Sequence, residues 1–356
     1  MTVRALEFYC GIGGLHFALS RSSLGGTVVR AFDWDQSACR VYKANHSNVV
    51  TNVDISTLAA ADLAAFKADL WLLSPACQPY TILNPKAKDS SDPRAQSFLH
   101  LIQDVLPELE STNQHPQRLL VENVAGFETS ATRQILVSIL HSLGYSTLEL
   151  LLTPLQFGIP NSRLRYYLLA KKASLSFPHV DPRKSDKLGR CIPGRVDWLD
   201  LRLDPDAIDH GSPTNSVVYD LRRYLDRGYD PREVLVPDKV LKKWGRLFDI
   251  VLPSSRRTCC FTRGYTQLVE RSGSVLQKNE ILDVQPEAVK ILHPLGLRYF
   301  SPEELLRLFD FNPCDPLAVP AFHWPDDIST KTRYRLIGNS VNIRVIQELI
   351  EYLFED

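Results

Sequence analysis

The sequence predicts an α/β protein with a mostly parallel sheet, helices on both faces of that sheet, and a second, smaller domain. Strand-like and helix-like runs alternate over the first half of the chain. From about residue 180 to 245, prolines, glycines and charged residues crowd together and no long periodicity remains. The 356 residues are also too many for one typical core. Because such alternation implies right-handed βαβ crossovers, the first half is expected to form the parallel sheet.

The expected strands are short runs rich in leucine or β-branched residues. They cover residues 5–10, 27–33, 69–74, 118–123, 146–152 and 165–170. Helical patterns lie between them, the clearest at residues 35–46, 95–109 and 129–143. Strand and helix therefore alternate as a parallel sheet requires.

A further helix is expected at residues 301–311. Ser301 can cap it, Pro302 fits its first turn and Glu304 completes a capping box. The last run, residues 341–354, is amphipathic and is expected to pack back onto the first domain. The chain is therefore divided at residues 1–179, 180–318 and 319–356, with the last segment completing the first domain.

Composition excludes several classes of protein. Forty-one Lys and Arg residues balance 41 Asp and Glu residues, so any surface that binds nucleic acid must be local. The seven cysteines are odd in number and form no C-x-x-C pair, which argues against a zinc site and a disulfide framework. A reducing compartment, cytosol or nucleus, is expected. No run of twenty apolar residues and no signal-like N-terminus is present, so neither secretion nor membrane insertion is expected.

A single cysteine follows the most apolar of the expected strands, in the stretch LLSPACQPYT (72–81). Pro75 and Pro79 stop regular structure after Ser74. Cys77 is thereby placed on a stiff loop at the end of a strand, where α/β proteins usually keep their chemistry. The alternative is an inert, half-buried thiol.

A glycine-rich turn and three downstream side chains point to a cofactor. The turn between the first strand and the next helix contains Gly11, Gly13 and Gly14. Asp33 ends the next strand twenty residues after Gly13, where a Rossmann-like fold keeps an acid for ribose hydroxyls. Trp34 could stack on an adenine ring or pack in the core, and Asp54 could make a third contact on the adenine side. The pattern favours a cofactor containing adenosine, either a nicotinamide dinucleotide or S-adenosylmethionine.

Two polar pairs follow at the same expected edge of the sheet. Glu122 and Asn123 follow an apolar run at the end of a strand. They could be a solvated strand end, or the Glu122 carboxyl could act as an acid. Arg163 and Arg165 lie two apart as the sixth strand begins, so in an extended segment they would share one face. Either arginine could be a surface charge, but a matched pair suits an anionic or carbonyl-bearing substrate.

Several of these stretches together resemble a known family. FYCGIGG, SPACQP, ENV, NSRLRY and RLIGNSVN fall in the order of the cytosine-5 methyltransferase motifs. Residues 97–109, 158–171 and 259–277 further resemble the DNA methyltransferase-2-type tRNA methyltransferases. Their hallmark Cys-Phe-Thr corresponds here to Cys260-Phe261-Thr262. The resemblance spans nearly the whole chain and is weakest from about residue 180 to 245.

The resemblance implies a Rossmann-like S-adenosylmethionine-dependent methyltransferase sheet and a smaller target-recognition domain. Residues 1–179 would form the catalytic, cofactor-binding domain. Residues 180–318 would recognise the target, and residues 319–356 would complete the catalytic domain. The methyl donor would be S-adenosyl-L-methionine, which leaves as S-adenosyl-L-homocysteine.

The implied catalytic residues are Cys77, Glu122, Asn123, Arg163 and Arg165. Because cytosine C5 is a weak nucleophile, the Cys77 thiolate would add to C6 and activate the ring, helped by a nearby cation such as either arginine. Glu122 would bind N3 and the amino group of the base. Arg165, in preference to Arg163, would hold O2, and Asn123 would orient the loop of Cys77. The base that removes the C5 proton is not identified.

The resemblance also implies two binding surfaces. The cofactor pocket would be lined by Phe8, Gly11, Gly13, Asp33, Trp34, Asp54 and Pro75, and closed by Asn339 and Ser340. The target would be bound by Cys260, Phe261, Thr262 and Arg263. Backbone phosphates could be held by Lys86, Lys88, Arg94, Arg256, Arg257 and Arg263. For each of these basic residues the alternative is a solvated loop.

The loop of Cys77 departs from the family at two positions. Ala76 replaces the second of two prolines that usually precede the nucleophile, and Ile82 replaces an arginine. The first change loosens the loop, which could slow the reaction by misplacing the thiol. The second could remove a substrate contact. Neither change affects Cys77 or Glu122, so an active enzyme is expected.

The sequence thus predicts a monomeric tRNA cytosine-5 methyltransferase that does not bind a membrane. The family points to the cytosine at position 38 in the anticodon loop of tRNA-Asp, with weaker or no action on DNA. One alternative is a DNA cytosine-5 methyltransferase, against which the short second domain and Cys260-Phe261-Thr262 argue. A catalytically weak RNA-binding relative is another. A nicotinamide dehydrogenase would need a hydride site, for which the sequence shows no residues.

Overall fold

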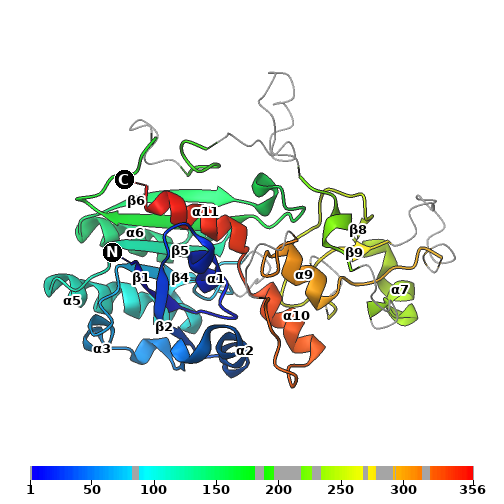
Figure 1. The fold of residues 1–356 in the computed structure, drawn as a ribbon, viewed down its shortest axis with the longest axis horizontal. Helices are drawn as coiled ribbons and strands as arrows, with labels where there is room; N and C mark the ends of the chain where they lie inside the picture. Colours follow the sequence, from blue (N-terminus) through cyan, green and yellow to red (C-terminus); the bar gives the residue numbers. More distant parts are fainter. Residues whose placement is uncertain are drawn as a thin grey trace. The chain divides into compact units, whose positions relative to one another are not determined.

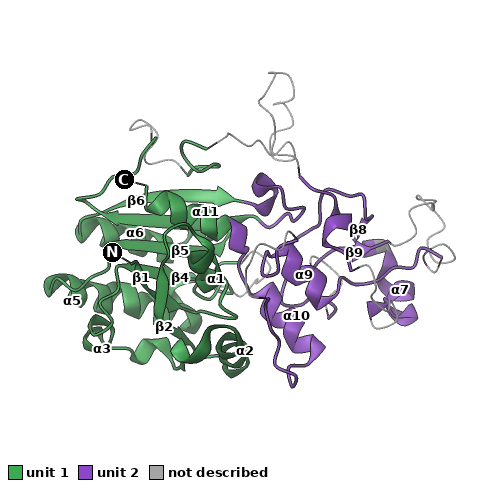
Figure 2. Cartoon of the chain, in the orientation of Figure 1, with its two compact units in different colours: residues 1–152, 164–213, 345–356 green, residues 153–163, 214–344 purple. Residues whose placement is uncertain are grey.

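The computed structural model describes most of the chain, namely residues 2–81, 88–180, 188–195, 218–226, 234–267, 272–277, 292, 294–314 and 321–355. The chain forms two compact units (Figures 1 and 2). Unit 1 contains residues 1–152, 164–213 and 345–356, and unit 2 contains residues 153–163 and 214–344. Ile82 and Lys86 lie outside the described residues.

Unit 1 is built on a seven-stranded sheet in the order β3-β2-β1-β4-β5-β7-β6. The strands are β1 Arg4–Phe8, β2 Thr27–Asp33, β3 Val50–Asn52, β4 Leu70–Leu73, β5 Arg118–Val124, β6 Tyr145–Leu152 and β7 Arg165–Lys172. β1 to β5 pair in parallel, whereas β7 is antiparallel to both of its neighbours. Every expected strand is present, so the predicted, mostly parallel sheet is confirmed. The three-residue β3 was not among the expected strands.

Helices cover the sheet of unit 1. They are α1 Gly14–Arg21, α2 Gln36–His46, α3 Ala60–Ala64, α4 Gln96–His100, α5 Leu106–Ser111, α6 Ala131–Ser142 and α11 Ile343–Leu353. Alternate strand residues such as Trp71 and Leu73 pack with the side chains of α3 to α6 in one apolar core. The intervening Leu70 and Leu72 are equally buried, so both faces of the sheet are covered.

One expected helix is interrupted. Residues 95–109 form α4 and α5 with a π-helical segment, Leu101–Val105, between them. Pro107 at the start of α5 explains the change, because proline has no N–H to donate and its ring crowds the carbonyl one turn earlier. The sequence pattern correctly predicted an apolar helical stripe but not this bulge.

The C-terminal helix returns to unit 1 as expected. In β5, Arg118 donates from Nε to the carbonyl of Leu353 in α11 at 3.0 Å. Gln347 of the same helix donates to the carbonyl of Arg21, the last residue of α1, at 3.2 Å. The amphipathic character of this segment therefore predicted its position correctly.

Unit 2 contains less regular structure. Its described elements are the turn Pro154–Phe157, the turn Leu221–Tyr224, α7 Asp238–Trp244, β8 Ile250–Val251, β9 Val275–Leu276, α9 Pro302–Leu308 and α10 Thr330–Gly338. The capping box at α9 is confirmed, since Ser301 Oγ accepts from the Glu304 N–H at 3.1 Å. In return, Glu304 Oε2 accepts from the Ser301 N–H at 2.8 Å.

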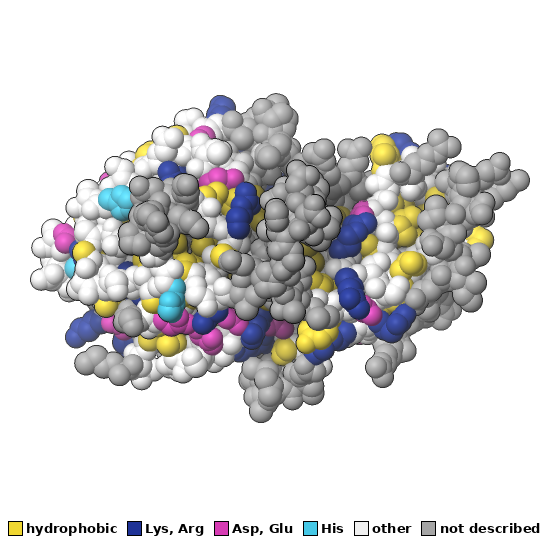
Figure 3. Space-filling view, turned by 90° about the horizontal axis from the view of Figure 1, so that it is seen from above, with side chains coloured by type: hydrophobic (Ala, Val, Ile, Leu, Met, Phe, Trp, Pro, Cys, Tyr) yellow, Lys and Arg dark blue, Asp and Glu magenta, His cyan; other side chains and the backbone are white. Residues whose placement is uncertain are grey.

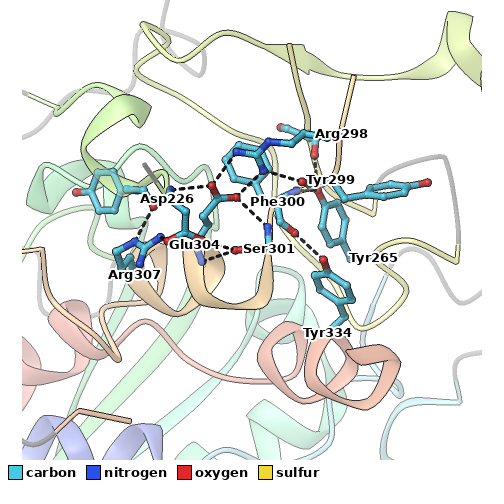
Figure 4. A network of polar contacts seen from close by, with 11 residues as sticks. Asp226, Tyr265, Arg298, Tyr299, Phe300, Ser301, Glu304, Arg307 and Tyr334 are labelled. Atoms are coloured by element: carbon cyan, nitrogen blue, oxygen red, sulfur yellow. Dashed lines mark hydrogen bonds and ion pairs between the residues drawn. The ribbon is translucent and has the colours of Figure 1, made fainter. Parts of the chain in front are cut away.

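A buried polar network organises the start of α9 (Figure 4). The Glu304 carboxylate takes two hydrogen bonds from the Arg298 guanidinium, at 2.7 and 2.8 Å. It also accepts the backbone N–H of Asp226 at 3.0 Å. Nearby, Tyr265 accepts from the Phe300 N–H at 2.9 Å. Because both members of the ion pair are buried and bonded to each other twice, the network fixes the local packing of unit 2.

The units divide the chain at other points than the predicted domains. Residues 153–163 and 319–344 belong to unit 2, whereas the sequence placed both in the catalytic domain. The division by function stays a prediction. No helix among the described residues is both long and apolar enough to cross a membrane.

Candidate active site

The loop of Cys77 follows β4 directly and is fixed at several points. The Cys77 carbonyl accepts the N–H groups of Tyr80 at 3.0 Å and Thr81 at 3.1 Å, which closes a tight turn. Tyr80 is buried with its ring edge against Phe127, at 4.7 Å between centroids. Cys77 itself remains partly exposed. The turn therefore presents the thiol while its aromatic neighbour holds the loop to the core.

Asn123 makes the contact expected of a residue that orients this loop. Its side chain is almost fully buried and donates from Nδ2 to the carbonyl of Pro75 at 3.3 Å. Its Oδ1 accepts the N–H of Val124 at 2.9 Å. The end of β5 is thereby connected to the loop that follows β4.

Glu122 and Arg165 meet beside the loop because of the strand register. Val124 of β5 pairs with Arg165 of β7, so Arg165 projects on the same face as Glu122, two residues away. Arg165 Nε lies 3.5 Å from Glu122 Oε1. Ser74, just after β4, donates its hydroxyl to Glu122 Oε2 at 2.6 Å. The ends of three neighbouring strands thus bring a carboxylate, a guanidinium and the cysteine loop to one edge of the sheet.

Arg94 is a cation that interacts with Cys77. The buried carboxylate of Asp92 accepts from Arg94 Nε at 2.8 Å and from Nη2 at 2.7 Å, which holds the guanidinium in a fork. This pair lowers the pKa of Asp92 to about 2. The pKa of Arg94 is raised, first by Asp92 and also by the electrostatic interaction with Cys77. The sequence nominated Arg94 only for phosphate binding and missed this relationship, because the two residues are seventeen positions apart on separate turns.

The predicted cofactor residues of unit 1 lie at the ends of β1, β2, β3 and β4, with Pro75 just after β4. Asp33 Oδ2 accepts the N–H of Gly11 at 2.8 Å, which ties the glycine turn to the end of β2. Burial raises the pKa of Asp33. Gly11 and Gly13 have positive φ angles of 53° and 86°, which favour glycine. Trp34 is 75% exposed, so the core-packing alternative is excluded and its indole is available to a ligand.

The remaining cofactor candidates of unit 1 differ in exposure. Asp54 is exposed and accepts from Ser56 N–H at 3.0 Å and Ser56 Oγ at 2.8 Å; these bonds lower its pKa. Phe8 is fully buried, with its ring between Phe32 at 5.3 Å and Trp71 at 4.9 Å. The Phe8 ring therefore belongs to the core, and its predicted place beside a cofactor stays a prediction.

A buried polar cluster behind the glycine turn was not predicted. Glu7 is fully buried, and its carboxyl accepts from Tyr42 Oη at 2.8 Å and from the His16 N–H at 3.3 Å. Burial raises the pKa of Glu7 to about 8. The His16 and His46 rings stack with centroids 3.8 Å apart. An acidic residue within the apolar strand ALEF was the only sequence signal for this cluster.

The other predicted site residues belong to unit 2. Arg163 precedes β7, which begins at Arg165, and the two arginines belong to different units, so the expected shared face stays a prediction. Arg163 donates to the carbonyls of Phe261, Gly338 and Ser340. Unit 2 thus brings Arg163, the predicted target residues 260–263 and the predicted cofactor residues 339–340 together.

Two of the three predicted phosphate-binding residues of unit 2, Arg256 and Arg257, are paired with acids. Arg256 Nε lies 2.8 Å from Asp220 and Arg257 Nη1 lies 2.8 Å from Asp249. On the face shown in Figure 3, the Lys and Arg side chains of the described residues lie in separate groups, with Asp and Glu side chains close to several of them. A local rather than a global nucleic-acid surface agrees with this distribution.

Comparisons with known proteins match almost the full chain. Residues 3–355 match the family described as C-5 cytosine-specific DNA methylase. The tRNA (cytosine(38)-C(5))-methyltransferase of Schizosaccharomyces pombe is 37% identical over 99% of this chain and 97% of its own length. The DNA (cytosine-5)-methyltransferase of Dictyostelium discoideum is 33% identical over 99% and 94%. The crystal structure of S. pombe Dnmt2 methyltransferase covers the whole chain and 99% of its own, with a TM-score of 0.80 and 35% identity.

Proposed function

The chain belongs to the C-5 cytosine-specific DNA methylase family, and we propose that it methylates C5 of a cytosine in tRNA, the reaction for which its relative from S. pombe is named. The expected fold class, a Rossmann-like methyltransferase sheet, is confirmed by the likeness to Dnmt2. The observation that carries the proposal is the grouping of the Cys77 loop, Glu122 and Arg165 at the ends of β4, β5 and β7.

The residues of unit 1 suit S-adenosyl-L-methionine as the methyl donor. An exposed indole, Trp34, stands next to the carboxylate of Asp33, a combination that fits an adenine ring and its ribose hydroxyls. A Cβ added at Gly11 would meet no atom within 4 Å, so space lies open beside the turn. When bound, the donor supplies a methyl group on a sulfonium sulfur.

In the proposed mechanism, the Cys77 thiolate forms a bond to C6 of the cytosine and makes C5 nucleophilic. Glu122 holds N3 and the amino group, and Arg165 donates to O2 as charge develops on the ring. The donor would supply its methyl group to C5, with the bond between that methyl group and the sulfonium sulfur broken, and would leave as S-adenosyl-L-homocysteine. Loss of the C5 proton restores the double bond and expels the Cys77 thiolate, which completes the turnover.

The proposed substrate is the anticodon loop of tRNA-Asp, at position 38. The relative from S. pombe carries that position in its name and matches almost the full chain. An anticodon loop presents bases that are already unstacked, so extraction of the target requires less energy than from a duplex. DNA is the second candidate, favoured by the name of the D. discoideum relative.

Methyl transfer from tritiated S-adenosyl-L-methionine tests both candidates. The wild-type protein is expected to label a tRNA-Asp transcript and not duplex DNA, and Cys77→Ala is expected to label neither. A tRNA with 5-fluorocytosine at position 38 should trap the wild-type protein covalently, because fluorine cannot leave as a proton does. Label in DNA alone would promote the second candidate. A folded protein that binds tRNA without label or adduct would be the catalytically weak relative.

A further inference from the structure

In unit 2, the side chain of Arg163 hydrogen-bonds to two separate segments of the chain. It is 3% exposed, and its guanidinium donates from Nη1 to the Phe261 carbonyl at 3.0 Å and to Cys260 Sγ at 3.4 Å. From Nη2 it donates to the carbonyls of Gly338 at 3.3 Å and Ser340 at 2.5 Å. One planar group therefore joins two segments that are more than seventy residues apart in the sequence.

The main chain around Arg163 is fixed separately. The Ser162 N–H donates to the Thr258 carbonyl at 2.9 Å, and Asn161 Nδ2 donates to Thr258 Oγ1 at 2.9 Å. The guanidinium also lies over the Phe309 ring, 5.1 Å from its centroid. The side chain thus extends from a main-chain segment that is held by hydrogen bonds of its own.

The two joined segments also touch directly. A Cβ added at Gly338 would lie 2.3 to 2.5 Å from the main-chain atoms of Thr262 and Arg263. Only glycine allows the end of α10 to approach the Cys260–Arg263 segment so closely. This contact does not involve the Arg163 side chain, and it also holds the Cys260–Arg263 segment against the end of α10.

We infer that Arg163 is a positioning residue that locks Cys260–Arg263 to Gly338–Ser340, so that the target RNA and the cofactor bind cooperatively. The inference rests on the proposed function and on the roles that the family resemblance implies, in which residues 260–263 would contact the target and Asn339 and Ser340 would contact the cofactor. Ordering of either segment by its ligand orders the other through the shared guanidinium. The second ligand then meets a segment that is already ordered.

The shape of arginine is essential to this role. Its planar fork reaches the Phe261 carbonyl with one nitrogen and the Gly338 and Ser340 carbonyls with the other. A lysine ammonium keeps the charge but offers a single nitrogen, which cannot span both segments. Arg163→Lys should therefore remove the connection while it preserves the charge.

Calorimetric titration of S-adenosyl-L-homocysteine, with and without a saturating tRNA-Asp transcript, measures the coupling. In the wild-type protein the transcript should tighten S-adenosyl-L-homocysteine binding by about fivefold or more. In Arg163→Lys and in Gly338→Ala, the dissociation constant of S-adenosyl-L-homocysteine should be about the same with and without the transcript, so that the ratio of the two values falls to about one. Circular dichroism establishes that each variant is folded, and Gly338→Ala decides alone if Arg163→Lys does not fold.

Arg298→Lys is the matched control. It alters a buried arginine of the same unit whose side-chain hydrogen bonds, among the described residues, go to Glu304 and to the Tyr299 carbonyl and not to either segment. It should lower the melting temperature and leave the ratio at the wild-type value. A ratio of one in the wild-type protein, or an unchanged ratio in folded Arg163→Lys, would overturn the inference. Failure of the wild-type protein to bind S-adenosyl-L-homocysteine at all would instead contradict the proposed function.

Discussion

Each unit buries a glutamate against an arginine, but the two pairs differ in how completely the carboxylate is bound. In unit 2, Glu304 accepts two bonds from Arg298 and the N–H groups of Ser301 and Asp226. In unit 1, Glu122 accepts one hydroxyl at 2.6 Å and lies 3.5 Å from the nearest Arg165 nitrogen. Both glutamates are less than a tenth exposed.

The difference separates a structural carboxylate from a functional one. An ionised carboxylate can accept about four hydrogen bonds. The chain itself supplies four to Glu304, so that side chain has no capacity left for a ligand. Glu122 keeps acceptor capacity at a strand end beside a partly exposed thiol. Burial and pairing with arginine, taken alone, would not have distinguished the two.

The largest expected effect concerns Glu122. Glu122→Gln preserves the shape of the side chain but removes the charge that binds the activated base. The turnover number should fall by about 10²- to 10⁴-fold, in the range typical of a lost acid–base group. The melting temperature should change little, because the chain supplies few hydrogen bonds to this carboxylate. Steady-state methylation of tRNA and a thermal melt of the same preparation measure both quantities.

Glu304→Gln is the matched substitution in the other unit, and the opposite result is expected. It leaves the buried Arg298 guanidinium without its charged partner, which should lower the free energy of unfolding by about 3–5 kcal/mol. Turnover by the folded fraction should stay within about twofold, since surface and scaffold changes away from a site rarely alter chemistry. If Glu304→Gln abolished turnover without a change in stability, the distinction between the two glutamates would be wrong.

Glu7 extends the comparison to a carboxyl that is not paired with an arginine. Its raised pKa of about 8 results chiefly from burial, with the Asp33 charge as a smaller contribution in the same direction. Between pH 4.5 and 8 the native protein therefore holds a proton that the unfolded chain has released, which lowers stability as the pH rises. His16 and His46, with pKa values lowered to about 4 and 3, act in the opposite sense below pH 6.5.

Of the three groups Glu7, His16 and His46, only Glu7 still makes the stability depend on pH above pH 6.5. Stability should therefore fall between pH 6.5 and 8, by roughly 2 kcal/mol for this one group. Glu7→Gln keeps the acceptor for Tyr42 and should flatten that interval. Urea denaturation at both pH values measures the difference. An equal decline in the wild-type protein and the variant would mean that another group is responsible.

The sequence predicted the sheet better than it predicted the site. Strands such as Leu70–Leu73 are covered on both faces, and a short run of consecutive apolar residues that ends at turn residues indicates them. The glycine turn, the end of β2 and the cysteine loop follow from that sheet, because chemistry collects at the carboxyl ends of parallel strands. The antiparallel pairing of β7, however, gives no local signal.

Side-chain relationships between distant segments were harder to predict. Arg163 and Arg165 were expected to share a face, because alternation holds within a strand. β7 begins only at Arg165, so the rule did not extend to Arg163. The pairing of Glu7 with Tyr42 depends on how a helix lies over a strand, and spacing in the sequence carries no such information.

The smallest expected effect concerns Arg94, the cation that interacts with Cys77. Because its side chain is 46% exposed, water screens its charge, and Arg94→Ala should slow a single turnover by only about twofold to fivefold. Asp92→Ala should cause a similar loss with Arg94 still present, because Asp92 is what holds the guanidinium in place. The double variant should then be no slower than either single one, since both changes remove the same interaction. Rapid-quench measurement of methyl transfer at saturating tRNA tests this. Additive losses would mean that Arg94 acts through the tRNA backbone and not through the Cys77 thiol. Among the described residues, Arg165 would then remain the cation proposed to contact the reacting base.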